Sequence, residues 1–197
     1  MIARRLLKLA RRRWAHIRLE RMGMRALFDS YPKDAIAPKY HQLFALYRMI
    51  VRRRPAVVVE LGGGYSTFII ARAARDLAAK GTAIRFFSVD ESEYWQSVVR
   101  GHMPQTLQAH TTFHRADVVA HPEGKGFASL PVERANFVYV DGGDLLDPVR
   151  LERDAPRDFA ILVDGRRSTV EFLKSHLTLN YRITSLDDGK QTLFERR

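Results

Sequence analysis

The chain has 197 residues, 46% of them hydrophobic, which is enough for one domain with a substantial core. It contains no cysteine, so disulfides, thiolate metal sites, iron–sulfur clusters and cysteine nucleophiles are excluded. A formal net charge of +11 favours an anionic partner such as nucleic acid, anionic lipid or an acidic small molecule. No run of eighteen apolar residues and no signal peptide is found, so we expect a cytoplasmic protein.

The positive charge is concentrated near the N-terminus. Residues 1–28 contain nine lysines and arginines and a single acid, Glu20. Apolar residues recur there at helical spacing, namely Leu6, Ala10, Trp14, Ile17, Met24 and Phe28. We therefore expect a basic amphipathic helix in residues 1–32, followed by a domain in residues 33–197.

Two interpretations of this basic helix remain open. In one, residues 1–28 bind an anionic membrane surface or RNA, because arginines pair with phosphates while the apolar edge enters the headgroup region. The protein would then lie peripherally at the membrane. In the other, the helix packs on the domain or on the second subunit of a homodimer.

Strand-like and helix-like segments alternate in the rest of the chain. Apolar runs typical of buried parallel strands lie at Ala56–Val59, Ile84–Val89, Thr111–His114, Phe137–Val140 and Phe159–Val163. Helical spacing occurs at residues 39–54, Ser66–Lys80, Glu91–Arg100 and Thr169–Leu177. The expected fold class is α/β, with a doubly wound Rossmann-like sheet.

The last part of the chain has a different pattern. Two strand-like runs, Tyr181–Leu186 and Gln191–Glu195, flank an Asp-Gly pair that is typical of a hairpin turn. We expect a seven-stranded, mostly parallel sheet that ends in this antiparallel hairpin. Residues 118–135, rich in glycine and proline, are expected to be irregular.

A glycine-rich turn, Glu60–Thr67, joins the first strand to the helix that follows it. Such a turn lets a ligand approach the backbone closely at the positive end of the helix. A dinucleotide-binding loop needs glycine at its first, third and sixth positions, but the sixth residue from Gly62 is Thr67. The order acid, any residue, glycine, any residue, glycine instead resembles motif I of class I S-adenosylmethionine-dependent methyltransferases.

This resemblance extends over roughly residues 35–197 and is closest to a bacterial O-methyltransferase-like branch. It implies that Glu60 contacts the methionine part of S-adenosylmethionine, that Asp90 binds both ribose hydroxyls and that Asp117 binds the adenine amino group. Ser66 stands where the family has a third glycine, and its hydroxyl can still cap the helix. The expected cofactor-binding residues are Glu60, Gly62, Gly64, Ser66, Asp90 and Asp117.

Two further acids end the fourth and fifth strands, where the active site of this architecture lies. Asp141 is our first choice for the group that orients an acceptor hydroxyl and removes its proton, and Asp164 is the second. Some catechol-type relatives bind magnesium at these positions, but Gly165 replaces their third ligand. A divalent cation could bind through Asp144 or water, yet the site we expect contains no metal.

The methyl acceptor itself is left open. We expect O-methylation of a small-molecule or sugar-type acceptor. A ribose 2′-O-methyltransferase of RNA is an alternative, since Lys39, Asp141, Lys174 and Glu195 occur in the order of the tetrad that such enzymes use. A third possibility is a non-catalytic binding module of the same fold, docked on a membrane through its basic helix.

Overall fold

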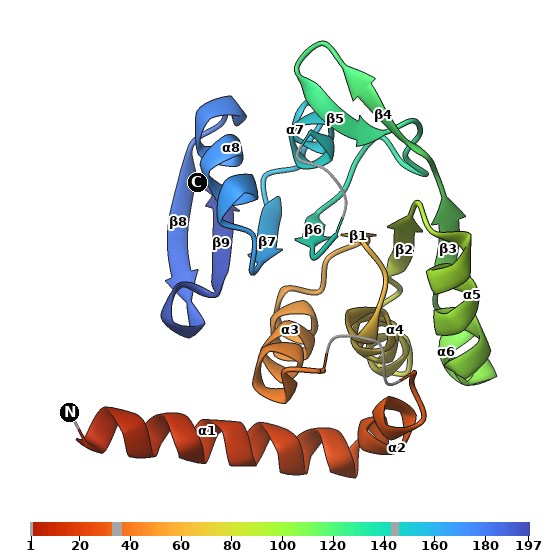
Figure 1. Cartoon of the computed structure of the whole chain (residues 1–197), viewed down its shortest axis with the longest axis vertical. Helices are drawn as coiled ribbons and strands as arrows, with labels where there is room; N and C mark the ends of the chain where they lie inside the picture. The colour runs from red at the N-terminus through yellow and green to blue at the C-terminus, as the bar shows by residue number, and fades with distance from the viewer. Residues whose placement is uncertain (1, 33–36, 143–145) are drawn as a thin grey trace.

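The computed structural model describes residues 2–32, 37–142 and 146–197, with side chains from residue 9 onward (Figure 1). The N-terminal part contains α1 (Ile2–Arg21), α2 (Met24–Asp29) and α3 (Tyr40–Arg53). Instead of one continuous basic helix there are two, because Gly23 takes up the left-handed conformation, with φ of +73°. The chain therefore changes direction between α1 and α2.

Seven strands form one sheet in the order β3-β2-β1-β6-β7-β9-β8. Their bounds are β1 (Val57–Leu61), β2 (Arg85–Asp90), β3 (Thr112–Arg115), β6 (Phe137–Val140), β7 (Ala160–Asp164), β8 (Tyr181–Leu186) and β9 (Gln191–Arg196). The first five strands are parallel, whereas β9 pairs antiparallel with both β7 and β8. The predicted doubly wound sheet with its C-terminal antiparallel hairpin is confirmed.

Helices cover both faces of the sheet, as the alternating pattern predicts. One face packs against α3, α4 (Tyr65–Ala78), α5 (Glu93–His102) and α6 (Gln105–Gln108). The other face packs against α7 (Asp147–Glu152) and α8 (Arg167–His176). Alternate residues of β1 enter the two cores, with Val58 in the first and Val59 in the second. This two-sided burial explains why the strands are almost continuously apolar.

The N-terminal helices share the first of these cores. Leu19, Met24 and Phe28 are buried in the same hydrophobic cluster as side chains of α3 and α4. The predicted apolar stripe is only partly the buried face, because Trp14 and Ile17 remain 48% and 37% exposed. The division of the chain at residue 32 stays a prediction, and buried side chains from both parts belong to one hydrophobic cluster.

The segment expected to be irregular contains a second, two-stranded sheet. β4 (Val118–His121) and β5 (Gly124–Phe127) form an antiparallel hairpin, which projects from the end of the main sheet in Figure 1. The fully buried Asp147 accepts a hydrogen bond from the backbone N–H of Phe127, which anchors the hairpin to α7. The prediction of irregular structure at residues 118–127 is therefore wrong.

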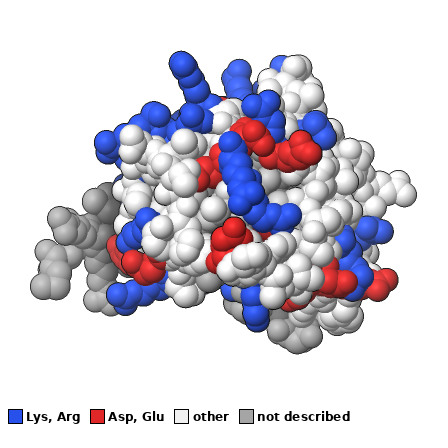
Figure 2. Space-filling view, turned by 90° about the horizontal axis from the view of Figure 1, so that it is seen from above, with Lys and Arg blue, Asp and Glu red and all other residues white. Residues whose placement is uncertain are grey.

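The charges are distributed unevenly over the surface. The face turned away from α1, seen from above in Figure 2, carries basic and acidic side chains close to each other. The exposed residues of α1 from residue 9 onward include five arginines and one acid, Glu20. Within the described ranges, no helix has both the length and the apolar character needed to span a bilayer.

Candidate cofactor and acceptor pocket

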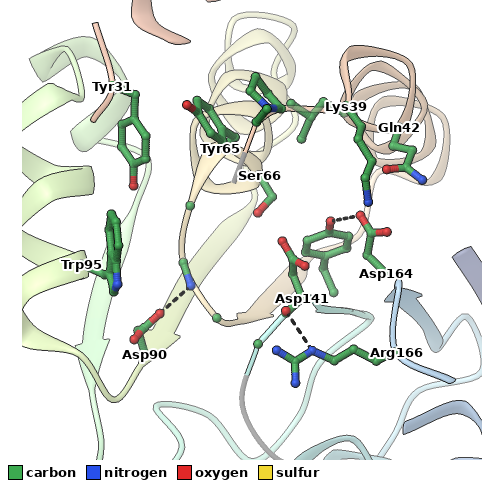
Figure 3. Close-up of a pocket in the computed structure, with 18 residues that line it drawn as sticks. Tyr31, Lys39, Gln42, Tyr65, Ser66, Asp90, Trp95, Asp141, Asp164 and Arg166 are labelled. Atoms are coloured by element: carbon green, nitrogen blue, oxygen red, sulfur yellow. Dashed lines mark hydrogen bonds between the residues drawn. The ribbon is translucent and has the colours of Figure 1, made fainter. Parts of the chain in front are cut away.

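One pocket lies at the carboxyl ends of the parallel strands and encloses about 450 Å³ (Figure 3). A volume of this size suits a small molecule. We call one half the loop side, formed by Gly62, Gly63, Gly64, Tyr65, Ser66, Asp90, Trp95 and Tyr31. We call the other half the acid side, formed by Lys39, Gln42, Tyr139, Asp141, Asp164 and Arg166. The pocket therefore brings the glycine loop and the two strand-end acids together, as the sequence predicts.

The glycine loop passes directly over the end of β6. Gly62 has φ of +92°, and a Cβ added to it would overlap the backbone of Gly142. A Cβ on Gly142 would in turn lie 2.8 Å from Cα of Gly62. Both positions therefore require glycine, since any side chain would force the two segments apart. Gly64, by contrast, has free space around it and an extended backbone.

Two carboxylates hold the loop in place. The backbone N–H of Gly63 donates to Oδ2 of Asp90 at 2.7 Å. The N–H of Gly64 donates to Oγ1 of Thr67 at 2.9 Å, and that hydroxyl donates to Oε2 of Glu60 at 2.7 Å. The loop is consequently fixed by its own chain before any ligand binds.

Asp90 ends β2 and has its carboxylate on the wall of the pocket. Its Oδ1 also accepts the N–H of Ser92 at 2.8 Å, so both oxygens are oriented by backbone donors. A carboxylate oxygen can accept more than one hydrogen bond, and each oxygen of Asp90 can accept another from a ligand hydroxyl. This geometry fits the predicted grip on a pair of ribose hydroxyls.

Glu60 is fully buried behind the loop and does not line the pocket. Ser88 donates a second hydroxyl hydrogen bond to its Oε2 at 2.7 Å. Burial raises the pKa of Glu60 to about 8, although hydrogen bonds from the neighbouring hydroxyls act against this rise. The predicted contact of Glu60 with a ligand stays a prediction. Its hydrogen bond from Thr67 gives it a role in holding the loop.

Asp117 is not brought into the pocket. Its carboxylate is 67% exposed and pairs with the guanidinium of Arg115 at 2.6 Å. The chain leaves the sheet after Arg115, the last residue of β3, so Asp117 lies beyond the strand end. The predicted contact of Asp117 with adenine stays untested. Asp117 is not among the described residues that line the pocket. Ser66, in contrast, is buried in the first turn of α4 and lines the pocket.

Asp141 and Asp164 lie side by side on the acid side, directly beyond β6 and at the end of β7. The surrounding protein reduces the hydration of Asp141 and, with the charge of Asp164, raises the pKa of Asp141 to about 6. The positive charges of Arg166 and Lys39 act in the opposite direction. Asp141 would thus be ionised at neutral pH and still basic enough to accept a proton.

Tyr139 is a pocket residue that the sequence analysis missed. It is buried in β6, and its hydroxyl donates to Oδ2 of Asp164 at 2.9 Å. Burial, together with the nearby carboxylates, raises the pKa of Tyr139 well above its usual value, so the hydroxyl stays protonated. It can therefore orient Asp164. Tyr139 lies two residues before Asp141, and side chains two residues apart along a strand point to the same side. This spacing could have identified Tyr139 from the sequence.

Arg166 adjoins the acids from the start of α8. Its Nε donates to the backbone oxygen of Asp141 at 3.0 Å. Within the described ranges, no group of three or more histidines, cysteines or acids is arranged to hold a metal ion. The third acid considered for a metal, Asp144, lies outside the described residues, and the metal-free site stays a prediction.

The tetrad of the RNA alternative is not assembled. Lys174 pairs with Glu171 on the exposed face of α8. Glu195 binds Arg53 and Arg182 at a second cavity, away from the pocket. Of the four residues, only Lys39 and Asp141 line the pocket. Their order in the sequence therefore does not correspond to one site.

The fold is that of class I S-adenosylmethionine-dependent methyltransferases. No protein-family model matches the chain, and no curated protein matches its sequence. Three solved structures show its architecture at 14% identity. An S-adenosylhomocysteine-bound methyltransferase of Podospora anserina aligns with a TM-score of 0.59, over 88% of this chain and 86% of its own.

The other two structures are bacterial. An O-methyltransferase of Bacillus cereus in complex with S-adenosylhomocysteine gives a TM-score of 0.60, over 88% of this chain and 90% of its own. A putative O-methyltransferase of Klebsiella pneumoniae gives 0.64, over 88% and 89%. The likeness therefore extends over most of each protein and shows that the fold is shared.

Proposed function

We propose that this protein is a S-adenosylmethionine-dependent methyltransferase that acts on an oxygen of a small-molecule acceptor. The observation that carries the proposal is the pairing of the glycine loop with Asp90 on the wall of the pocket. A loop of this kind opposite a strand-end carboxylate suits a nucleoside, because the backbone accepts close approach and the carboxylate binds two hydroxyls. The likeness to cofactor-bound methyltransferases supports the same interpretation.

The loop side fits the proposed cofactor in shape and chemistry. Tyr31 and Trp95 stack with ring centroids 6.5 Å apart and form an apolar wall beside Asp90. Gly62, Gly63 and Gly64 present backbone without side chains to this side of the pocket. S-adenosylmethionine, when bound, supplies an activated methyl group. The protein's part is to hold the nucleoside through Asp90 and to present the methyl group towards the acid side.

The acid side provides groups for the acceptor. Asp141, with a pKa raised to about 6, is positioned to take the proton of an acceptor hydroxyl as the oxygen attacks. Tyr139 fixes one oxygen of Asp164, which leaves the other oxygen to orient the acceptor. Arg166, held by the backbone of Asp141, keeps a positive charge beside the two acids.

Calorimetry with S-adenosylhomocysteine tests the proposal. The intact chain should bind it, and Asp90→Ala should weaken binding at least 30-fold, which corresponds to about 2 kcal/mol for the lost charge-assisted hydrogen bonds. Asp154→Ala is the matched control, because Asp154 is an exposed acid outside the pocket. Absence of binding to the intact chain, or equal losses in the two variants, would contradict the proposal.

For the basic N-terminal helix we propose attachment to an anionic membrane surface. On α1, Leu9 and Ile17 are 55% and 37% exposed among arginines, and Trp14, whose ring packs against Phe44, is still 48% exposed. Apolar side chains within a cationic surface suit a layer of anionic headgroups better than the groove of RNA, because they gain from entering the lipid.

Flotation with anionic and zwitterionic vesicles tests this attachment. The protein should float with vesicles that contain phosphatidylserine, and the double variant Leu9→Ser/Ile17→Ser should lose most of this binding. Val119→Ser, which changes an exposed apolar residue of β4, is the control and should float normally. An RNA gel shift without flotation, or no binding in either assay, would show the proposal to be wrong.

A further inference from the structure

Arg166 is a cation of the acid side whose guanidinium is held in place. Its Nε donates to the backbone oxygen of Asp141 at 3.0 Å, which fixes the plane of the group beside the end of β6. Within the part of the chain that the structure describes, its two terminal nitrogens donate to no protein atom and the group forms no ion pair. Arg166 is exposed and lines the pocket, so a ligand can reach these nitrogens.

The helix that begins beside Arg166 does not account for an arginine at this position. Arg166 is the N-cap of α8, and it makes no side-chain capping hydrogen bond. Helices favour a hydrogen-bond acceptor at the N-cap and acids in the first turn, because the first N–H groups are unpaired and partly positive. α8 has no acid in its first turn, so the charge of Arg166 adds to that of the helix end. Both charges favour an anion bound to Arg166.

The two cations of the acid side have different surroundings. Figure 3 shows the ammonium group of Lys39 directed towards Asp164, whereas the guanidinium of Arg166 lies on the opposite side of Asp141. Asp164 therefore has a nearby cation as well as the hydrogen bond from Tyr139. The charge of Arg166 acts on Asp141 through space, without a direct ion pair among the described residues. Its terminal nitrogens are thus available to an anionic group of a ligand.

The donors that remain on Arg166 indicate which anion fits. With Nε bound, the two terminal nitrogens present a pair of parallel N–H bonds, which matches the two oxygens of a carboxylate. Ala37, Pro38 and Leu43 also line the pocket and give it apolar surface. A ligand that uses all these groups has a carboxylate for Arg166, an apolar body, and a hydroxyl that approaches Asp141.

We propose that the acid side binds a small hydroxylated carboxylic acid, whose carboxylate pairs with the terminal nitrogens of Arg166 while its hydroxyl approaches Asp141. This assignment rests on the proposed function, in which Asp141 takes the proton of that hydroxyl. Arg166 determines specificity, because it selects acceptors by their negative charge and fixes the direction in which they enter. A neutral acceptor of the same shape forms no ion pair with the guanidinium.

Three probes built on one ring test the selection by charge. At neutral pH cis-3-hydroxycyclohexanecarboxylate is anionic, its amide is neutral, and the corresponding aminomethyl compound is cationic. On the chain saturated with S-adenosylhomocysteine, NMR titration should show the acid binding at least tenfold more tightly than the amide or the amine. Equal binding of the three probes, or no binding of the acid, would overturn the assignment.

Variants of Arg166 test the residue itself. Arg166→Gln should weaken binding of the acid at least tenfold and leave binding of the amide within threefold, because only the acid loses an ion pair. Arg166→Lys keeps the charge without the paired donors and should recover part of the loss.

Arg167→Gln is the matched control, since Arg167 is an exposed neighbour that does not line the pocket. This variant should bind the acid within twofold of the unchanged chain. Equal losses for the acid and the amide in Arg166→Gln, or equal losses of acid binding in Arg166→Gln and Arg167→Gln, would show that Arg166 does not pair with the carboxylate.

Calorimetry with S-adenosylhomocysteine on the same samples separates the two proposals. Arg166→Gln should bind it within threefold of the unchanged chain, because Arg166 lies on the acid side. If the unchanged chain binds S-adenosylhomocysteine but does not prefer the acid to the amide, only the hydroxy-acid assignment is wrong. If it does not bind S-adenosylhomocysteine, the proposed function is wrong as well.

Discussion

The two sides of the pocket differ in how completely their polar groups are paired. On the loop side, the N–H groups of Gly63 and Gly64 and both oxygens of Asp90 have partners within the chain, and the buried hydroxyl of Ser66 has none among the described residues. On the acid side, Oε1 of Gln42 and Oδ1 of Asp164 have none among the described residues, and Asp141 has a raised pKa.

This difference shows which part of the site is formed in advance. A loop that satisfies its own hydrogen bonds keeps its shape without a ligand, so little ordering is needed when a nucleoside binds. Unpaired polar atoms and a carboxyl group with a shifted pKa destabilise the folded protein, and both are typical of functional sites. The backbone of the loop side is thus formed in advance, and the acid side carries the carboxyl group whose pKa is perturbed.

Replacement of Gly62 should give the largest effect on the rigid side. Gly62→Ala introduces a Cβ at positive φ that overlaps the backbone of Gly142. We expect a loss of about 2 to 4 kcal/mol in the free energy of unfolding, measured by urea denaturation. Gly64→Ala, at an open position with extended backbone, should change it by less than about 1 kcal/mol. Equal losses would mean that the two segments do not touch.

Replacement of Asp141 should have the largest effect on catalysis without disturbing the loop side. With a hydroxylated acceptor and methyl-labelled S-adenosylmethionine, Asp141→Asn should lower kcat about 100-fold or more. In the unchanged protein the rate should rise with pH up to about 6 and then level off, because only the ionised carboxylate accepts a proton. Asp154→Asn, outside the pocket, should keep both the rate and this profile. A rate independent of pH from 5 to 7 would exclude Asp141 as the base.

Thr67 tests whether the loop depends on its internal hydrogen bonds. Thr67→Val removes the hydroxyl between Gly64 and Glu60 and should weaken S-adenosylhomocysteine binding about tenfold, as expected for one hydrogen bond. Thr67→Ser keeps the hydroxyl and should bind within threefold. Calorimetry gives both values, and similar losses in the two variants would point to the lost methyl group instead.

Replacement of Glu60 should give the smallest effect at low pH, because it acts on the pH dependence of stability. Its folded-state pKa of about 8 lies above the ordinary value of 4.5, so the folded protein holds a proton that the unfolded chain has lost. The stabilisation is complete below about pH 4.5 and declines as pH rises towards 8, by at most about 1.4 kcal/mol per pH unit. Glu60→Gln resembles the protonated form. In this variant the free energy of unfolding, measured with urea at pH 5 and pH 8, should fall less between the two pH values. An unchanged slope would contradict the raised pKa.

The sequence predicts the sheet well because its signals are local. Runs such as Phe137–Val140 are both apolar and β-branched or aromatic, and the observed strand has the same bounds. The β4–β5 hairpin is not predicted because both strands are short, β5 contains two glycines, and the exposed residues do not alternate with buried ones as in a typical strand.

The site was predicted less completely because its contacts are distant in the chain. Asp90, Asp141 and Asp164 follow buried strands and could be placed at one edge of the sheet. Asp117 could not be excluded in this way, since only the structure shows that the chain turns away after β3. Gln42 comes from the helix before the first strand, and its amide is held by Asp187, in a turn near the other end of the chain. No local pattern in the sequence connects these two residues.

The contact between Gly62 and Gly142 has a further consequence for evolution of the site. Asp141 immediately precedes Gly142, so the distance from the glycine loop to this carboxylate is set by two backbones in contact and not by side-chain packing. Substitutions elsewhere around the acid side can change which acceptor fits while this spacing stays constant. A change of acceptor therefore does not require a new geometry for the transfer itself.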